Sequence, residues 1–259
     1  MRILLPPSEG KSAPSVAADF SLGQLSFPDL TEPRLRVATA LVSLSKQPKR
    51  AAAELGLGPT QLGELEANCS LWSGPLAPAI ALFSGVLFDA LDYPSLTPAQ
   101  KRRADEQLLI FNGLTGVASP QDLLPAFRLG GAVTLPRVGN VGTFWKRELA
   151  TALSFDSGEL IVDARSGTYA RFWRPEHEAD LVSVKVVQLV GSGGQQRKVA
   201  VSHFNKATKG RLVRDLLTSR ATINDLAGLT ARLESMGWEF ELLPARGKTP
   251  ATLEVLLRL

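Results

Sequence analysis

The alternation of apolar and polar positions predicts short strands interspersed with amphipathic helices. Short apolar runs bounded by turn residues are typical of strands, whereas apolar positions three and four apart are typical of helices. Strands are expected at 2–6, 112–117, 159–163, 181–190, 198–202, 238–243 and 249–257. Helices are expected at 34–70 with a break at 55–59, at 99–111, at 143–153, after residue 202 and at 222–236. Residues 89–98 are predicted to form a loop.

Two local signals sharpen this pattern. Thr97 followed by Pro98 is typical of a helix start, where a hydroxyl caps the first turn and proline fits the first helical position. The glycine-rich segment 191–196 is predicted to be the loose tip of a β-hairpin. Because neither a repeat nor a linker-like stretch interrupts the chain, we predict one mixed α/β domain over residues 1–259.

Composition excludes several classes of protein. The chain has 44% hydrophobic and 21% charged residues, which are ordinary values for a globular protein and argue against wholesale disorder. Cys69 is the only cysteine, so an intrachain disulfide framework is excluded. No apolar stretch approaches the length of a membrane span, about 18 residues, and the apolar run at 2–5 is too short for a signal peptide. We therefore expect a cytoplasmic protein without membrane partners.

The positive charge is concentrated in one segment. Residues 197–220 contain seven lysines and arginines and one acid, Asp215, which gives +6; because the whole chain is +4, the other residues sum to −2. A local basic excess is typical of a phosphate or nucleic-acid site, although a solvated helix face would give the same run.

The spacing of the residues in 197–220 predicts which of them share a face of the helix. At about 100° per residue, one face of the predicted helix is apolar and Arg211 and Arg214 lie on the other. The apolar positions are Leu212, Val213, Leu216 and Leu217. Lys206 and Lys209 lie near the helix start, where the dipole attracts anions, and Gly210 would allow close approach. We therefore predict an anion site there.

Polar residues also follow the predicted strand at 2–6. Gly10-Lys11-Ser12 suggests a nucleotide-binding loop, but Leu5 stands where that loop needs its first glycine, and Pro14 opposes the helix that should follow. The remaining prediction is weaker: Ser8, Glu9 and Lys11 lie at the end of a strand, where sites on α/β sheets commonly form.

A second group of polar residues follows the strand at 159–163. Asp163 fits either a magnesium-holding carboxylate or, more simply, a cap of the next turn. Arg165, Ser166 and Tyr169 follow closely and could grip an anion or a base, although Tyr169 fits the core equally well. We predict no metal site and no cofactor, because two histidines and one cysteine are too few for a usual zinc site.

The break at Leu55-Gly56-Leu57-Gly58-Pro59 has two interpretations. A helix-hairpin-helix element would offer its backbone amides to a nucleic-acid phosphate. An ordinary corner between two helices fits better, because residues 59–66 contain two acids and neither lysine nor arginine.

Several segments together resemble the YaaA family of peroxide-stress proteins, in order and over nearly the whole chain. These are Pro7-Ser8 with Lys11, Phe83 and Gly85, the block from Gly113 to Leu129, Phe144-Trp145, Ser166 with Tyr169, and Lys206, Lys209-Gly210 and Arg214. The resemblance implies a single-domain α/β fold with a mixed sheet, flanking helices, a basic cleft and a helix-hairpin-helix element. It also implies DNA binding and a part in limiting oxidative damage.

Two functions follow as hypotheses. A non-catalytic DNA-binding protein would contact the phosphate backbone, with little sequence specificity, through Lys206, Lys209, Gly210, Arg211, Arg214, Lys11 and Arg165. Alanine at Lys206 and Lys209 would then reduce the salt dependence of duplex binding by about two charges. An enzyme acting on a nucleotide or a nucleic-acid base would use Lys11, Asp163, Ser166, Tyr169 and Lys206. An open basic groove favours the first hypothesis, and an apolar-walled pocket favours the second.

Overall fold

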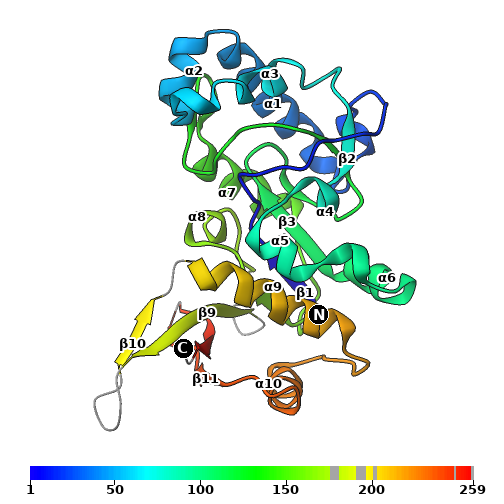
Figure 1. Cartoon of the computed structure of the whole chain (residues 1–259), viewed down its shortest axis with the longest axis vertical. Coiled ribbons are helices and arrows are strands. Elements are labelled where there is room, and N and C mark those ends of the chain that lie inside the picture. The colour runs from blue at the N-terminus through cyan, green and yellow to red at the C-terminus, as the bar shows by residue number, and fades with distance from the viewer. Residues whose placement is uncertain (176–180, 191–196, 201–202, 248, 258–259) are drawn as a thin grey trace.

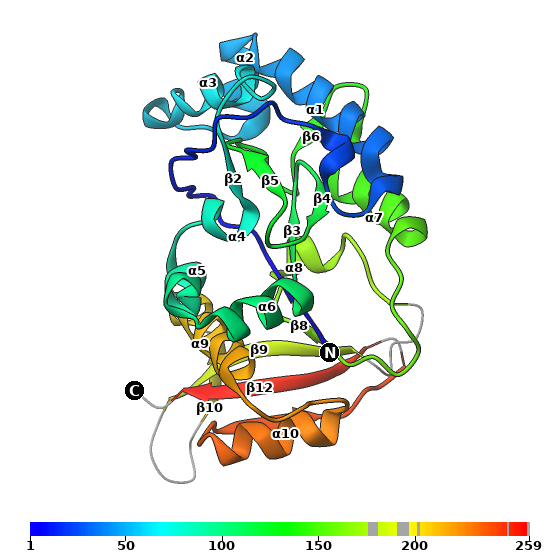
Figure 2. The same ribbon diagram turned by 90° about the vertical axis from the view of Figure 1, so that its right-hand side faces the viewer.

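A mixed sheet forms the middle of the molecule (Figures 1 and 2). The computed structural model describes residues 1–175, 181–190, 197–200, 203–247 and 249–257. In this part of the chain the main sheet has eight strands in the order β11-β12-β9-β8-β1-β3-β4, with β10 paired to β9. The strands are β1 (Arg2–Leu5), β3 (Leu108–Asn112), β4 (Gly116–Ala118), β8 (Ile161–Asp163), β9 (Leu181–Val190), β10 (Arg197–Ala200), β11 (Phe240–Leu243) and β12 (Ala251–Leu257).

The centre of the sheet is parallel and its margins are antiparallel. β1 pairs in parallel with β3 on one side and β8 on the other, and β8, β9 and β12 continue in parallel. The pairs β3–β4, β9–β10 and β11–β12 are antiparallel. Ile3, Leu4 and Leu5 are fully buried, as expected for a central parallel strand covered on both faces. The predicted mixed α/β fold class is confirmed.

Helices cover the sheet and build both ends of the molecule (Figure 2). They are α1 (Thr31–Ser45), α2 (Pro48–Leu55), α3 (Glu64–Cys69), α4 (Ala79–Leu82), α5 (Val86–Leu91), α6 (Pro98–Gln107), α7 (Val141–Ala152), α8 (Gly167–Ala170), α9 (His203–Thr218) and α10 (Leu226–Ser235). Short 3-10 turns are η1 (Leu22–Gln24), η2 (Pro28–Leu30), η3 (Pro59–Gln61) and η4 (Tyr93–Ser95). Two small sheets pair β2 (Leu76–Pro78) with β5 (Leu123–Pro125) and β6 (Thr134–Leu135) with β7 (Gly139–Asn140).

Most of the predicted elements form, and one central prediction is wrong. Helix α6 begins after Thr97, whose side chain accepts from the Gln100 amide in a capping box. Residues 108–111, predicted to end this helix, instead form β3, because their apolar run is buried between β1 and β4. The predicted loop at 89–98 contains the end of α5 and η4. The hairpin tip at 191–196 and residues 201–202 lie outside the described residues.

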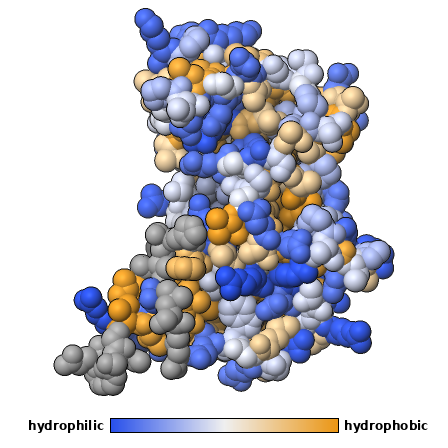
Figure 3. Space-filling view, in the orientation of Figure 1, coloured by the Kyte–Doolittle hydropathy of each residue, from blue (hydrophilic) through white to orange (hydrophobic). Residues whose placement is uncertain are grey.

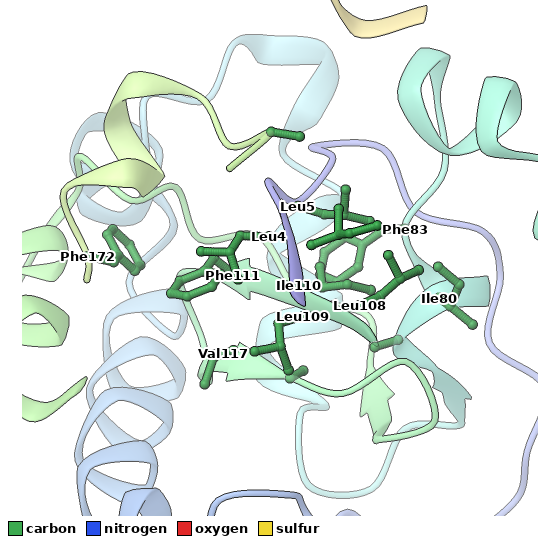
Figure 4. Close-up of a cluster of buried hydrophobic side chains, with 14 of the residues drawn as sticks. Leu4, Leu5, Ile80, Phe83, Leu108, Leu109, Ile110, Phe111, Val117 and Phe172 are labelled. Carbon is green, nitrogen blue, oxygen red and sulfur yellow. The ribbon is translucent and has the colours of Figure 1, made fainter. Parts of the chain in front are cut away.

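Apolar side chains from β1 and β3 pack together at the sheet centre. Figure 4 shows Leu4 and Leu5 among the β3 residues, with Phe83 on one side and Phe172 on the other. All of these side chains are at most a few per cent exposed. This core fixes the end of β1, and therefore also the loop that follows it.

One arginine is part of the core near α1. Arg34 is fully buried, and its guanidinium donates hydrogen bonds to the carbonyls of Ser26, Phe27, Thr115 and Val117. Burial lowers the pKa of Arg34 to about 10, and the nearby Asp122 carboxylate opposes that shift. The group remains charged at neutral pH and ties α1 to the β4 segment.

Among the described residues, the helices are all too short or too polar to cross a membrane.

Candidate functional site

The loops after β1 and β8 leave the same edge of the sheet, because these neighbouring strands are parallel. They border a cavity of about 640 Å³, which we call the cleft. Its described lining comes from Leu55 and from residues within segments 6–11, 83–88, 127–132, 164–169 and 205–209. The space-filling view of Figure 3 shows the molecule narrowing between the α1–α3 end and the β9–β10 end.

Lys11 lies in the cleft on the loop after β1. The loop is held by a hydrogen bond from the Ser12 amide to the Leu82 carbonyl, at 2.8 Å. The Lys11 ammonium lies 4.5 Å from the ring centroid of Phe127 and 5.5 Å from that of Phe83. It donates long hydrogen bonds to the carbonyls of Ser8 and Glu9, at 3.4 and 3.3 Å. Burial, together with the Arg128 charge, lowers the pKa of Lys11 to about 8.

Lys206 and Lys209 enter the cleft from α9, one turn apart. Lys206 is exposed, whereas Lys209 is only 8% exposed. The Lys209 ammonium donates to the carbonyls of Ala164 and Arg165, at 3.0 and 3.2 Å, and so joins α9 to the end of β8. Burial lowers the pKa of Lys209 to about 8, although Asp163 opposes the shift. Figure 1 shows α8 and the first turns of α9 on the same side of the molecule.

Ser166 and Tyr169 line the cleft next to the carbonyls that Lys209 contacts. Ser166 is exposed directly before α8, and Tyr169 lies within that helix. The Tyr169 hydroxyl accepts a hydrogen bond from the Gly131 amide at 3.2 Å. Burial raises the pKa of Tyr169, so the phenol stays neutral at physiological pH.

Arg128 is a cleft residue that the charge pattern did not single out. Its guanidinium forms ion pairs with Glu9 at 3.1 Å and Glu64 at 3.2 Å. The fully buried Asn68 holds its backbone, accepting from the Arg128 amide and donating to its carbonyl. An isolated arginine in an irregular segment gives no sequence signal of this kind; only the family resemblance included it.

Asp163 and Arg165 form a buried pair and do not line the cleft. The Arg165 guanidinium donates to both carboxylate oxygens of Asp163, at 2.9 and 2.8 Å, and to the Trp173 carbonyl. It also lies 4.2 Å from the ring centroid of Phe111. Asp163 additionally accepts from the Arg165 amide, as the capping interpretation predicts. With these contacts the two side chains stabilise the turn after β8 and face the core.

Three of the residues predicted to contact DNA, Gly210, Arg211 and Arg214, also lie outside the described lining of the cleft. Gly210 packs against α5, where an added Cβ would lie 2.2 Å from the Leu87 carbonyl oxygen. Arg214 donates to the carbonyls of Leu91 and Asp92 and so closes the end of α5. Arg211 is exposed but lies outside the described lining. The four apolar residues of the predicted α9 face are all buried, as expected.

The segment at 55–59 forms a corner between α2 and η3. Gly56 ends α2 with a left-handed φ of +66°, the conformation in which glycine is favoured. α3 follows as a helix of six residues. Leu55 contributes its side chain to the cleft lining.

The cleft combines a positive charge excess with aromatic walls. Four cations (Lys11, Arg128, Lys206 and Lys209) and one carboxylate, Glu9, belong to the described lining. Such a set binds anions, and the hydroxyls of Ser166 and Tyr169 add donors and acceptors. Within the residues that the structure describes, no group of three or more His, Cys, Asp or Glu could hold a metal ion.

Comparisons with known proteins agree with one another. A family model described as "Peroxide stress protein YaaA" matches residues 1–242. A UPF0246 protein of Streptomyces coelicolor is 41% identical, with 99% of this chain and 98% of that protein covered. A UPF0246 protein of Corynebacterium efficiens is 42% identical over 85% of this chain and 86% of its own length.

Proposed function

The chain belongs to the YaaA family of peroxide stress proteins, and on that premise we propose that it binds DNA through the cleft. The observation that carries the proposal is the convergence of three lysines, Lys11, Lys206 and Lys209, on one cavity. Arg128 also lines this cavity, but its charge is already paired with Glu9 and Glu64. Cations gathered in this way attract phosphate and release its counterions. Such binding is largely electrostatic and has little sequence specificity.

The exposed and the buried lysines would contribute differently. Lys206 is exposed at the rim, where it can meet a backbone phosphate. Lys209 is largely buried and its ammonium is already bonded to two carbonyls. We therefore assign the outer phosphate contact to Lys206 and a deeper contact to Lys11.

The dimensions of the cleft favour one nucleotide unit over a long groove. A cavity of about 640 Å³ is within the usual range of small-molecule sites, about 300–1,000 Å³. Phe83 and Phe127 are part of its wall. We propose that DNA enters with one unit turned out of the base stack, a step that costs a few kcal/mol and is easiest at a damaged position.

A second function is favoured by the pocket-like shape. Lys11, Ser166, Tyr169 and Lys206 all line the same cavity, which is the arrangement expected of an enzyme acting on a nucleotide or a base. Asp163 is not part of that set, because its carboxylate is paired with Arg165. An enzyme at this site would rely on its lysines, serine and tyrosine.

The salt dependence of duplex binding tests the primary proposal. Lys206→Ala is expected to lower the slope of log K against log salt by about one, because one phosphate contact is lost. Adding Lys209→Ala is expected to change the slope by less than one more, since the Lys209 ammonium is held by carbonyls. Lys146→Ala, an exposed lysine on α7, is the matched control and should leave the slope unchanged. An unchanged slope in Lys206→Ala would contradict the assignment.

A further inference from the structure

We propose that Lys11 is a nucleophile whose amine captures the aldehyde carbon of an abasic sugar in DNA as an imine. The inference rests on the proposed DNA binding and names the substrate class of the same cleft. It concerns a group that phosphate binding alone does not explain, a half-buried amine on the loop after β1.

The surroundings of Lys11 suit a reactive amine better than a structural one. Within the described chain its ammonium makes no ion pair, and its two hydrogen bonds to carbonyls are long, at 3.3 and 3.4 Å. A neutral amine can keep both bonds and still direct its lone pair elsewhere. The rings of Phe83 and Phe127 flank it and limit the access of water.

The other two cleft lysines are less suited to this role. Lys209 is 8% exposed and bonds to its two carbonyls at 3.0 and 3.2 Å, which fixes its position between α9 and β8. Lys206 is exposed to solvent, so its amine lacks the shielding by aromatic rings that surrounds Lys11. Of the three, Lys11 is the half-buried lysine beside the Arg128 guanidinium; desolvation and that charge lower its pKa, and the Glu64 and Glu9 carboxylates oppose the shift.

The proposed step is balanced without an additional reactant. The Lys11 nitrogen attacks C1′ of the ring-opened sugar, and a C–N bond forms. The carbonyl oxygen then leaves with the two amine hydrogens as one water molecule, giving a C=N bond. Ser166 and Tyr169 are the hydroxyl groups in the described lining that would pass a proton to the departing oxygen.

An abasic sugar fits the cleft for two physical reasons. Without a base, the unit loses little stacking when it leaves the duplex, which reduces the cost of entering a pocket. A flanking phosphate can remain on the exposed ammonium of Lys206. Base loss therefore supplies both the aldehyde and the easier entry.

The test is borohydride reduction of the protein mixed with a duplex containing one abasic site. Reduction converts an imine to a stable amine, so a covalent protein–DNA adduct is expected, with the attachment mapped to Lys11 by peptide mass spectrometry. Lys11→Arg keeps the charge and should lower adduct formation at least tenfold. Lys146→Arg, on the exposed face of α7, should form the adduct as the unsubstituted protein does.

The comparison duplexes separate this inference from the proposed function. A duplex with a tetrahydrofuran in place of the abasic sugar has no aldehyde and should be bound but not trapped. Binding without any trapped adduct would overturn the inference and leave DNA binding intact, as would an adduct mapped to Lys206 or Lys209. Loss of binding to every duplex would overturn both. Free 2-deoxyribose, trapped as efficiently as the duplex, would contradict DNA as the source of the aldehyde.

Discussion

Within the described chain, the buried arginine of α1 (Arg34) and the half-buried lysine of the cleft (Lys11) both lack an ion-paired carboxylate, yet their surroundings differ. Four carbonyls converge on the guanidinium of Arg34 at 2.8–3.3 Å, from segments on both sides of the core. Lys11 has two carbonyls from its own loop, at longer distances, and a cavity in front of it. The hydrogen bonds of the Arg34 guanidinium are therefore satisfied within the protein. The Lys11 amine can still bind a ligand in the cavity.

The comparison teaches that burial of a charge is not by itself a sign of function. The three nitrogens of the Arg34 guanidinium all find acceptors inside the protein, so this charged group stabilises the fold. The charge of Arg165 is instead neutralised by Asp163 and lies over the Phe111 ring, while its Nη1 is buried without a hydrogen-bond partner in the described chain. The cleft lysines retain an uncompensated charge that a phosphate or a chemical step could use.

The largest effect is expected from Arg34→Met. Methionine has a similar length but donates no hydrogen bond, so four carbonyls in the core would lose their donor. Because each unsatisfied buried group costs about 1–3 kcal/mol, the free energy of unfolding should fall by at least about 3 kcal/mol. Urea unfolding followed by circular dichroism measures this change. Lys49→Met, at an exposed position of the neighbouring helix α2, is the control and should change the free energy of unfolding by less than about 0.5 kcal/mol.

A smaller effect, and one that separates stability from binding, is expected from Lys11→Met. Removing the half-buried charge of Lys11 should leave the free energy of unfolding within about 1 kcal/mol of the original value. The same variant should bind duplex DNA more weakly, with a salt slope lower by about one. A loss of stability as large as that of Arg34→Met would show that both cations serve the fold and would remove the contrast between the two regions.

The smallest effect is expected in the pH dependence of stability. The pKa of Lys11 and that of Lys209 are about 8 in the folded protein and 10.5 in the unfolded chain. Below pH 8 both states carry the charge and folding must bury it. Between pH 8 and about 10 the unfolded chain binds more protons, so the free energy of unfolding should rise with pH.

Urea unfolding at pH 7.5 and pH 9.5 tests this expectation. Between these two pH values the free energy of unfolding should rise less in Lys11→Met than in the unsubstituted protein. After allowance for solvent screening, the difference between the two proteins should be less than about 1 kcal/mol. Measurement should stop near pH 10, because burial raises the pKa of Tyr169 and ionisation of the unfolded tyrosine then lowers stability. Equal rises in both proteins would mean that Lys11 titrates normally.

Local pattern predicted much of the fold but not the direct transition from α6 to β3. The capping box at Thr97 and the apolar face of α9 depend on residues within one or two turns, so the sequence indicates them well. Residues 108–111 follow α6 without a turn residue, and only their place between β1 and β4 makes them a strand. Tertiary context therefore decided that element.

Some features of the candidate site could likewise be predicted from local spacing, and others could not. The spacing of Lys206 and Lys209 predicted that they share a surface, and both line the cleft. The contacts of Arg214 cannot be read from spacing, because its carbonyl partner Leu91 lies 123 residues away. The burial of Arg34 could not be predicted from the sequence either, because an arginine in a helical pattern normally indicates an exposed position.

The position of β1 has a consequence for biosynthesis. Leu4 lies opposite Leu109 on one side and Asp163 on the other, so both neighbours leave the ribosome more than a hundred residues after it. Until then this apolar strand has no native partner, and such long-range pairing is slow to form. A nascent chain halted before Asp163 should therefore be a client of chaperones, and translation speed should affect the yield of native protein more than any change at the cleft.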